Sequence, residues 1–308
     1  MITLDKQASP KPVSALPLKA APEVRARGLD NTFGKPREFL GNRFVYALIS
    51  QRARGLSIGI NLNPDHFCNF DCAYCEVNRD KTPLDRAVDL DVMAAELEGL
   101  LARAFQGRLR ELPYFRLVPE ELLKLKAVTL SGDGEPTLCA NFAEVVREVV
   151  HIRSLRRFPF FKIVLITNTS GLGRPDVDAG LIHLTSDDEI WVKLDAGTQE
   201  YMDRVNRSKD ITLQQVLEKI LLLGRERAVV IQSLFPLMHG LEPPAEEIEA
   251  YVQRLKALES DGAKISLVQI YSAHRAPHRP DCGHLPLKAL SRIAQRVREV
   301  TGLKAEVF

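Results

Sequence analysis

The feature that most constrains this chain is a regular alternation of short apolar segments with longer amphipathic ones. Short apolar runs predict buried strands, and apolar residues at helical spacing predict helices packed on a sheet. The expected strands are Gly55–Leu62, Ala127–Leu130, Lys162–Thr167, Glu189–Leu194, Val229–Leu234 and Lys264–Tyr271, and the expected helices are Leu90–Phe105, Phe142–Leu155, Val177–Leu184, Leu213–Leu223, Glu246–Leu258 and Leu287–Val300. Six strand–helix units predict an α/β fold, a partial (β/α)6 barrel, with Ala305–Phe308 as a short edge strand.

Polar residues follow several of the expected strands at their carboxyl ends. Parallel barrels place their chemistry at this end, where the strands meet in a common rim. Asn168 and Asp195 end the third and fourth strands and are candidates for ligand contacts. A second set lies near strand ends, where its members are candidates for facing a substrate inside the barrel: Lys193, Gln232, Gln269 and Tyr271.

Three cysteines form a CxxxCxxC array in the loop after the first strand: Cys68, Cys72 and Cys75. Three thiolates on an iron–sulfur cubane leave one iron open to another ligand. Two other readings remain. His66 could complete a zinc knuckle, although zinc ligands usually come as two separated pairs, and a redox pair of Cys72 and Cys75 would leave Cys68 unexplained.

A glycine-rich segment, SGDGEPT, follows the apolar run Ala127–Leu130. Gly132 and Gly134 carry no Cβ atom, so the backbone around them can approach a ligand closely. A ligand with a free ammonium group could hydrogen-bond this backbone and pair with Glu135. Taken alone, the same residues are equally typical of a β-turn.

Together, CxxxCxxC and the later GEP segment resemble the radical S-adenosylmethionine (radical SAM) superfamily. The form DGEPT, and the segment KLDAGTQEYMDRVNR from Lys193 to Arg207, resemble the subfamily that includes the wyosine-type tRNA-modifying enzymes. The resemblance covers most of Gly55 to Phe308 and implies the partial-barrel fold. It also implies that the three cysteines hold one 4Fe-4S cluster and that S-adenosylmethionine is bound by Tyr74, Gly132, Asp133, Gly134, Glu135, Asn168 and Asp195.

The activity that this resemblance implies is reductive cleavage of S-adenosylmethionine to a 5′-deoxyadenosyl radical. The radical would abstract hydrogen from an unknown small-molecule or nucleotide-like substrate, with electrons from a one-electron reductant such as flavodoxin or ferredoxin. Alternatives are wyosine-type tRNA modification, aminocarboxypropyl transfer from S-adenosylmethionine, and a non-catalytic metal-binding module. Cys139 and Cys282 are isolated, so no auxiliary cluster is expected, and no cysteine precedes Cys68, which departs from archaeal wyosine-forming enzymes.

Composition favours a soluble cytoplasmic protein with no membrane association. The chain has 308 residues, 45% of them hydrophobic, and no apolar run reaches the ~20 residues of a transmembrane helix. Its five cysteines suit a reducing compartment, and its net charge of +2 gives no global attraction to nucleic acid. We expect residues 1–40 to form a poorly ordered arm and residues 41–308 to form the radical SAM partial-barrel domain.

Overall fold

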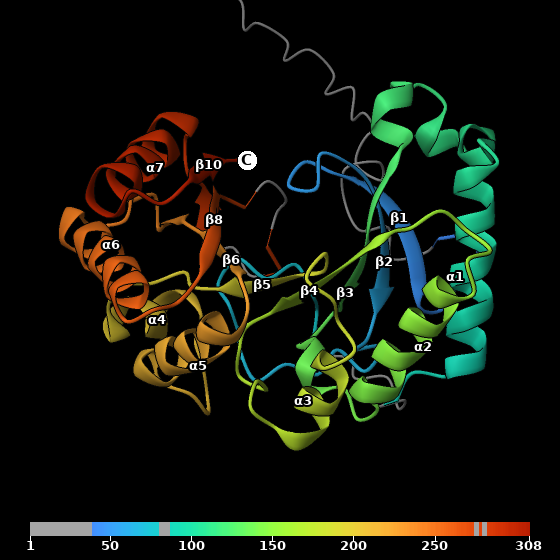
Figure 1. The fold of residues 1–308 in the computed structure, drawn as a ribbon. Helices are drawn as coiled ribbons and strands as arrows, with labels where there is room; N and C mark the ends of the chain where they lie inside the picture. The colour runs from blue at the N-terminus through green and yellow to red at the C-terminus, as the bar shows by residue number, and fades with distance from the viewer. Residues whose placement is uncertain (1–38, 80–86, 274–276, 279–281) are drawn as a thin grey trace, which may run out of the picture.

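A curved sheet of parallel strands lies inside a layer of helices (Figure 1). The computed structural model describes residues 39–79, 87–273, 277–278 and 282–308, so most of the expected N-terminal arm lies outside the described residues. The parallel strands are β2 (Gly55–Asn61), β3 (Leu125–Ser131), β4 (Lys162–Thr167), β5 (Glu189–Lys193), β6 (Val229–Leu234) and β8 (Ile265–Tyr271). They pair in chain order, which confirms the predicted partial (β/α)6 barrel.

Two further strands extend the sheet at its edges. β10 (Ala305–Val307) pairs with β8, as expected for an edge strand, whereas β1 (Val45–Ser50) pairs antiparallel with β2 and was not predicted. The β1–β2 turn contains no Asn–Gly or Asp–Gly pair, the usual sequence signal of a hairpin. Arg54 supplies its left-handed residue, with φ of 57°.

The helices follow the strands and cover the outer face of the sheet (Figure 1). All six expected helices are present. One further short helix, α4, was not predicted and lies in the segment after β5. The helices are α1 (Leu90–Phe105), α2 (Phe142–Ser154), α3 (Pro175–Leu181), α4 (Gln199–Val205), α5 (Leu213–Glu226), α6 (Ala245–Ser260) and α7 (Leu287–Thr301), with 3-10 turns at Arg108–Glu111, Pro113–Phe115, Glu120–Leu123 and Pro136–Leu138. A two-stranded ribbon pairs β7 (Pro236–Met238) with β9 (Cys282–His284). No helix in the described part of the chain is both long enough and apolar enough to cross a bilayer.

Alternation along the strands separates two apolar clusters. Ile190 and Val192 of β5 belong to the large cluster between sheet and helices. Trp191, between them, belongs to a small second cluster on the opposite, inner face, which also contains Ala127, Val164 and Val230. Because side chains alternate between faces, Lys193 lies on the inner face with Trp191. The interior of the barrel is therefore apolar at the level of Trp191 and polar nearer the carboxyl ends of the strands.

The β1–β2 turn reaches across to the far edge of the sheet. Ala53 packs against the inner apolar cluster, and the guanidinium of Arg52 lies 4.4 Å from the ring centroid of Tyr271. Arg54 forms an ion pair with Glu306 of β10 at 2.5 Å. In Figure 1 this turn arches from β1 toward β8 and β10. One turn thus links the first and last strands of the open barrel.

A buried ion pair joins the end of α2 to the starts of β4 and β5. The Arg153 guanidinium donates to both carboxylate oxygens of Asp188, at 2.6 and 3.0 Å. Asp188 also accepts from the backbone N–H groups of Ile163 and Thr185, both at 2.8 Å. Burial alone would raise the pKa of Asp188, but these hydrogen bonds outweigh it and hold that pKa below its usual value.

We predict that Asp188→Asn lowers the free energy of unfolding by about 3 kcal/mol at pH 7, because it leaves Arg153 buried without its charge partner. A lowered carboxyl pKa stabilises the fold above its unfolded value of about 3.9, and that contribution is lost as pH falls through the folded pKa. The difference between wild type and variant in urea unfolding should therefore shrink on acidification below about pH 4. The exposed pair partner Asp176 gives the control, Asp176→Asn, which should change stability little. A difference that widens on acidification would contradict the prediction.

Candidate active site

The cysteine loop follows β2 and lies against the segment that follows β3. The backbone N–H of Glu135 donates to the carbonyl of Phe67 at 3.0 Å, and the Asn63 amide donates to the carbonyl of Glu135 at 3.0 Å. A Cβ atom at Gly134 would lie 1.8 Å from the Phe67 carbonyl oxygen. The close approach therefore requires glycine, and the two sequence motifs are in direct backbone contact.

The three motif cysteines carry free, half-buried thiols. The amide nitrogen Nδ2 of Asn168 lies 3.8 Å from Sγ of Cys68, and that of Asn206 lies 3.7 Å from Sγ of Cys72. Burial is the main influence on these thiols: it raises the pKa of Cys68 to about 12 and the pKa of Cys72 to about 11. Metals bind thiolates, so a metal bound by these cysteines would have to displace their protons.

Arg79, four residues after the last motif cysteine, is the cation next to these thiols. Its Nε donates to the carbonyl of His66 at 3.3 Å, and its guanidinium hydrogen-bonds Cys75. Burial alone would lower the pKa of Arg79, but its interactions with Cys75, Cys68 and Cys72 outweigh burial and raise it. A cation here stabilises thiolates and the negative charge of a thiolate-bound cluster.

The contacts of His66 differ from those that a zinc knuckle would require. Its Nδ1 lies 3.1 Å from the carbonyl of Asn78, and its Nε2 lies 3.9 Å from Oδ2 of Asp133. Within the described residues, no three His, Cys, Asp or Glu side chains converge on a site for a single metal ion. The three thiols and the neighbouring Arg79 suit a larger anionic cluster better than one tetrahedral zinc ion.

The carboxylate of Glu135 ties the SGDGEPT segment to the end of β4. Oε1 accepts from the backbone N–H and hydroxyl of Thr137 and from the hydroxyl of Thr167, at 3.1, 2.6 and 2.5 Å. Oε2 accepts from the backbone N–H of Asn168 at 2.7 Å. Glu135 is only 2% exposed, and burial raises its pKa although these donors partly offset the effect. Because Oε2 has one donor, it can accept a second hydrogen bond from a ligand.

Two asparagines before the cysteines line the same segment from the other side. The Asn61 amide donates to the Asp133 carboxylate at 2.9 Å, and Asn61 Oδ1 accepts from the Asp133 backbone N–H at 2.9 Å. Asn63 Oδ1 is buried and has no hydrogen-bond partner within the described residues. A Cβ atom at Gly132 would lie 2.4 Å from this oxygen. An unpaired buried acceptor beside two glycines fits a ligand that donates hydrogen bonds, such as an ammonium group.

Asn168 and Asp195 connect the strand ends to the cysteine loop. Asn168 Nδ2 donates to Oδ1 of Asn69 at 3.1 Å. Asp195 Oδ2 accepts from the Tyr74 hydroxyl at 2.5 Å and from Asn206 Nδ2 at 2.7 Å. Tyr74 lies between Cys72 and Cys75, so this carboxylate fixes the second half of the motif.

The four inner-face candidates form one hydrogen-bond network. Lys193 pairs with Gln232, and Gln232 with Gln269, across three neighbouring strands. The Lys193 ammonium donates to the Tyr271 hydroxyl at 3.1 Å, Tyr271 donates to Gln232 Oε1 at 3.2 Å, and Gln232 Nε2 donates to Gln269 Oε1 at 3.2 Å. Burial alone would lower the pKa of Lys193, but Asp195, 3.5 Å away, and Tyr271 raise it, so Lys193 is a cation at neutral pH.

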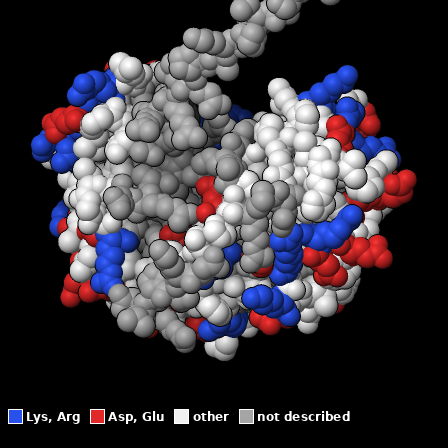
Figure 2. Space-filling model, turned by 180° about the vertical axis from the view of Figure 1, so that it is seen from behind, with Lys and Arg blue, Asp and Glu red and all other residues white. Residues whose placement is uncertain are grey.

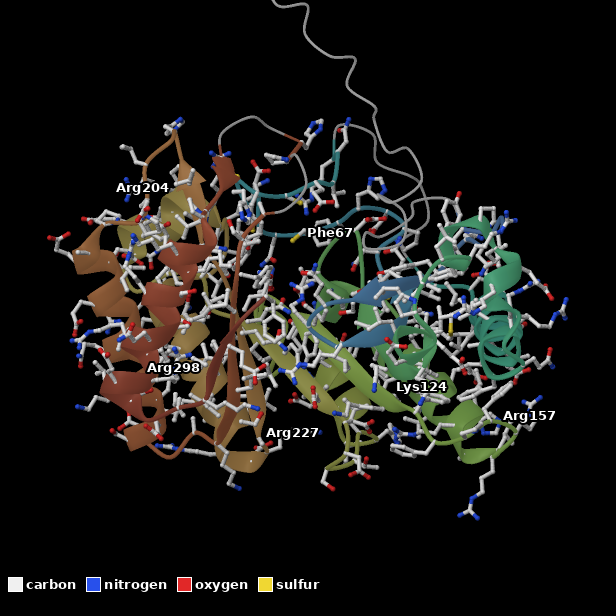
Figure 3. The ribbon with its side chains drawn as sticks, turned by 90° about the horizontal axis from the view of Figure 1, so that it is seen from above. Phe67, Lys124, Arg157, Arg204, Arg227 and Arg298 are labelled. Carbon is white, nitrogen blue, oxygen red and sulfur yellow. The ribbon has the colours of Figure 1, made fainter. Side chains whose placement is uncertain are left out.

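Figure 3 shows the molecule from above, with its side chains drawn. Phe67, next to Cys68, lies over the centre, whereas Arg204, Arg298 and Arg157 lie toward the outside. Every predicted site residue is thus found at or near the carboxyl ends of the strands. The sequence analysis did not name Asn61, Asn63, Asn69, Arg79 or Asn206 as site residues. The Asn61–Asn63 pair has a recognisable signal, two amides at the end of a strand, and Asn206 lies within the KLDAGTQEYMDRVNR segment.

A family profile described as the radical SAM superfamily matches residues 62–255, more than half of the chain. The chain belongs to the radical SAM superfamily. Membership implies a 4Fe-4S cluster and S-adenosylmethionine as cofactors. The matched region begins just before the cysteines and includes the SGDGEPT segment, Asn168 and Asp195.

Among curated proteins, the chain is similar to UPF0026 proteins. It is 28% identical over 180 residues to one from Methanocaldococcus jannaschii, covering 56% of this chain and 47% of that protein. It is 24% identical over 237 residues to one from Helicobacter pylori strain J99, covering 76% of this chain and 68% of that protein. The chain thus matches about half the length of the archaeal relative.

Solved radical SAM enzymes share this fold. Streptococcus suis SuiB bound to S-adenosylmethionine aligns with a TM-score of 0.57 and 12% identity, over 84% of this chain and 52% of that one. TYW1 with a lysine–pyruvate adduct bound aligns with a TM-score of 0.53 and 18% identity, over 80% of this chain and 74% of that one. Both likenesses show the fold.

We predict that Gly134→Ala separates the cysteine loop from the SGDGEPT segment, because the added methyl group collides with the Phe67 carbonyl. Iron bound after anaerobic reconstitution should fall by at least about half and the melting temperature should fall as well. Gly99→Ala is the control: Gly99 lies in α1, where an added methyl group would meet no atom within 4 Å, so the change should stabilise the fold by about 0.5–1 kcal/mol. Full iron content in Gly134→Ala would show that the backbone contact is not needed for the cluster.

Proposed function

We propose that Cys68, Cys72 and Cys75 hold the 4Fe-4S cluster and that the strand ends around them bind S-adenosylmethionine. The observation that carries this proposal is the backbone contact between Glu135 and Phe67, which joins the cysteine loop to the SGDGEPT segment. Asn63 Oδ1, buried and unpaired within the described residues, supports a ligand with a donor group at this point. The other proposed cofactor contacts are Tyr74, Gly132, Asp133, Gly134, Glu135, Asn168 and Asp195.

The cluster and S-adenosylmethionine, when bound, supply one-electron reduction and cleavage of a carbon–sulfur bond to a 5′-deoxyadenosyl radical. The protein's own residues position and shield the reacting groups. Glu135 and Asp195 are almost fully buried and fix the two sides of the cysteine loop. Amide donors from Asn168 and Asn206 lie beside Cys68 and Cys72, where hydrogen bonds to sulfur tune the reduction potential.

The reaction that we propose is hydrogen abstraction from a small-molecule or nucleotide-like substrate inside the barrel. The inner-face residues Lys193, Gln232, Gln269 and Tyr271 are the proposed substrate contacts, because they lie on the inner face and their network reaches Tyr74 through Asp195. A one-electron reductant such as flavodoxin or ferredoxin would reduce the cluster.

Wyosine-type tRNA modification is the second candidate. The fold shared with TYW1 favours it. A protein that binds tRNA usually presents a basic patch. On the face shown in Figure 2, however, Lys and Arg side chains are interspersed with Asp and Glu. tRNA that copurifies and is released by salt would favour this candidate.

We predict that anaerobically reconstituted protein binds about four irons and four sulfides per chain. Cys68→Ala, Cys72→Ala and Cys75→Ala should each abolish this binding. Cys139→Ala and Cys282→Ala are the matched controls, and both variants should keep the iron and sulfide. The Cys139 thiol donates a hydrogen bond to Asn141, and the Cys282 thiol donates one to the carbonyl of Ala73. About four irons in Cys72→Ala, or zinc without sulfide in wild type, would contradict the cluster proposal.

The products of the reduced protein test the reaction class in the same samples. With dithionite and S-adenosylmethionine we expect slow formation of 5′-deoxyadenosine even without substrate, detected by chromatography. Methylthioadenosine as the main product would instead indicate aminocarboxypropyl transfer.

We predict that Glu135→Ala weakens S-adenosylmethionine binding by about 2–4 kcal/mol, or roughly thirty-fold to a thousand-fold in Kd, because the cofactor ammonium loses its buried partner. The melting temperature should also fall, since four buried donors lose their acceptor. Thr167→Val is the control: it removes one of these donors but keeps the carboxylate, so it should lower stability and leave the Kd unchanged. Normal cofactor affinity in Glu135→Ala would assign Glu135 to structure alone.

A further inference from the structure

The polar groups inside the barrel offer hydrogen-bond donors but few acceptors. Lysine can only donate hydrogen bonds, so the Tyr271 hydroxyl accepts from Lys193 and donates onward to Gln232. Gln232 in turn donates to Gln269. This direction is imposed by the lysine and fixes both amide orientations. It leaves the Gln269 Nε2 group without an acceptor within the described residues.

Two cations flank this network. The Lys193 ammonium contacts Tyr271 and Asp195, and its side chain keeps 16% of its surface exposed. Arg52, from the β1–β2 turn, stacks on the Tyr271 ring with its guanidinium 4.4 Å from the centroid. Arg52 is half-buried and has no carboxylate partner within the described residues.

The carboxylate oxygens of Asp195 have hydrogen-bond donors other than Lys193. Its carboxylate accepts from the Tyr74 hydroxyl, the Asn206 amide and the backbone N–H of Leu234, at 2.5, 2.7 and 2.8 Å. Lys193 stands farther away, at 3.5 Å. The Lys193 ammonium is therefore not needed as a hydrogen-bond donor to Asp195 and can donate to a ligand. Lys193 and Arg52 together carry two positive charges against the one negative charge of Asp195, so this part of the barrel has an excess of positive charge.

We propose that the barrel interior binds an anionic substrate through a carboxylate or phosphate group, which Lys193, Arg52 and the Gln269 amide hold. Each of these groups donates, and an anionic oxygen accepts several hydrogen bonds at once. This inference rests on the proposed function for where the reaction takes place, since Asp195 and Tyr74 link the anion site to the cysteine loop.

The test is anion binding to the cluster-loaded, full-length protein by anaerobic calorimetry, which needs no turnover. The probes are succinate and inorganic phosphate, with uncharged succinamide as the matched neutral compound. We expect saturable binding of at least one anion and none of succinamide. Emission from Trp191, the one tryptophan of the chain, should change in parallel because it lies two residues before Lys193 on the same face.

Variants show whether the proposed cations are responsible. Lys193→Met and Arg52→Met should each weaken anion binding at least tenfold, whereas Lys193→Arg should retain it. Lys288→Met, which removes an exposed lysine of α7, is the control and should bind as wild type does. Thermal unfolding of each variant checks that the fold is intact. Equal affinity in Lys193→Met and wild type, or no saturable anion binding to wild type, would overturn the proposal.

The carboxylate of S-adenosylmethionine is the other anion that these donors could bind. Repeating the titration with saturating S-adenosylmethionine separates the two sources. Unchanged anion binding would support a substrate site. Loss of anion binding, with weaker S-adenosylmethionine binding in Lys193→Met, would overturn it and assign Lys193 to the cofactor. Iron content and 5′-deoxyadenosine formation report on the proposed function independently of both results.

Discussion

The arrangement of the site depends on one buried carboxylate, that of Glu135. It accepts hydrogen bonds from the segment after β3 and from the end of β4, while its backbone N–H holds the cysteine loop through Phe67. Three parts of the chain that are distant in sequence are fixed around this residue. A buried anion is costly without such donors, so the motif and the strand ends around it depend on each other. The Asp195 carboxylate does the same on the other side of the loop, where it holds Tyr74 and Asn206.

Much of the fold could be predicted because parallel strands buried on both faces leave a clear record in sequence. Strands β2, β4 and β6 are mainly apolar, and polar residues such as Asn61, Thr167 and Gln232 lie at or near their carboxyl ends, which the barrel brings to one rim. The cysteine triad and the SGDGEPT segment were recognisable because the residues of each motif are close together in the sequence. The roles predicted for these residues in binding stay predictions.

What sequence reasoning missed depends on contacts between distant segments. Arg79 acquires its place among the thiols only when the cysteine loop folds back, and Asn206 reaches Cys72 from α4 across 134 positions of sequence. Strand β1 was overlooked because its turn uses two arginines and an alanine where glycine or asparagine is usual. No local pattern indicates the long-range contacts that these three features make.

The contacts of that same turn can form only late in the synthesis of the chain. Arg54 and Glu306 are 252 positions apart, so the contact between the two edges of the sheet forms only when Glu306 has left the ribosome. Before Tyr271 has been made, Arg52 has no ring to stack on, and Ala53 has only part of the inner cluster to pack against. The cysteine loop and its asparagine neighbours are made far earlier, so a newly made chain passes through a stage in which its thiols are present and this side of its interior is unsealed.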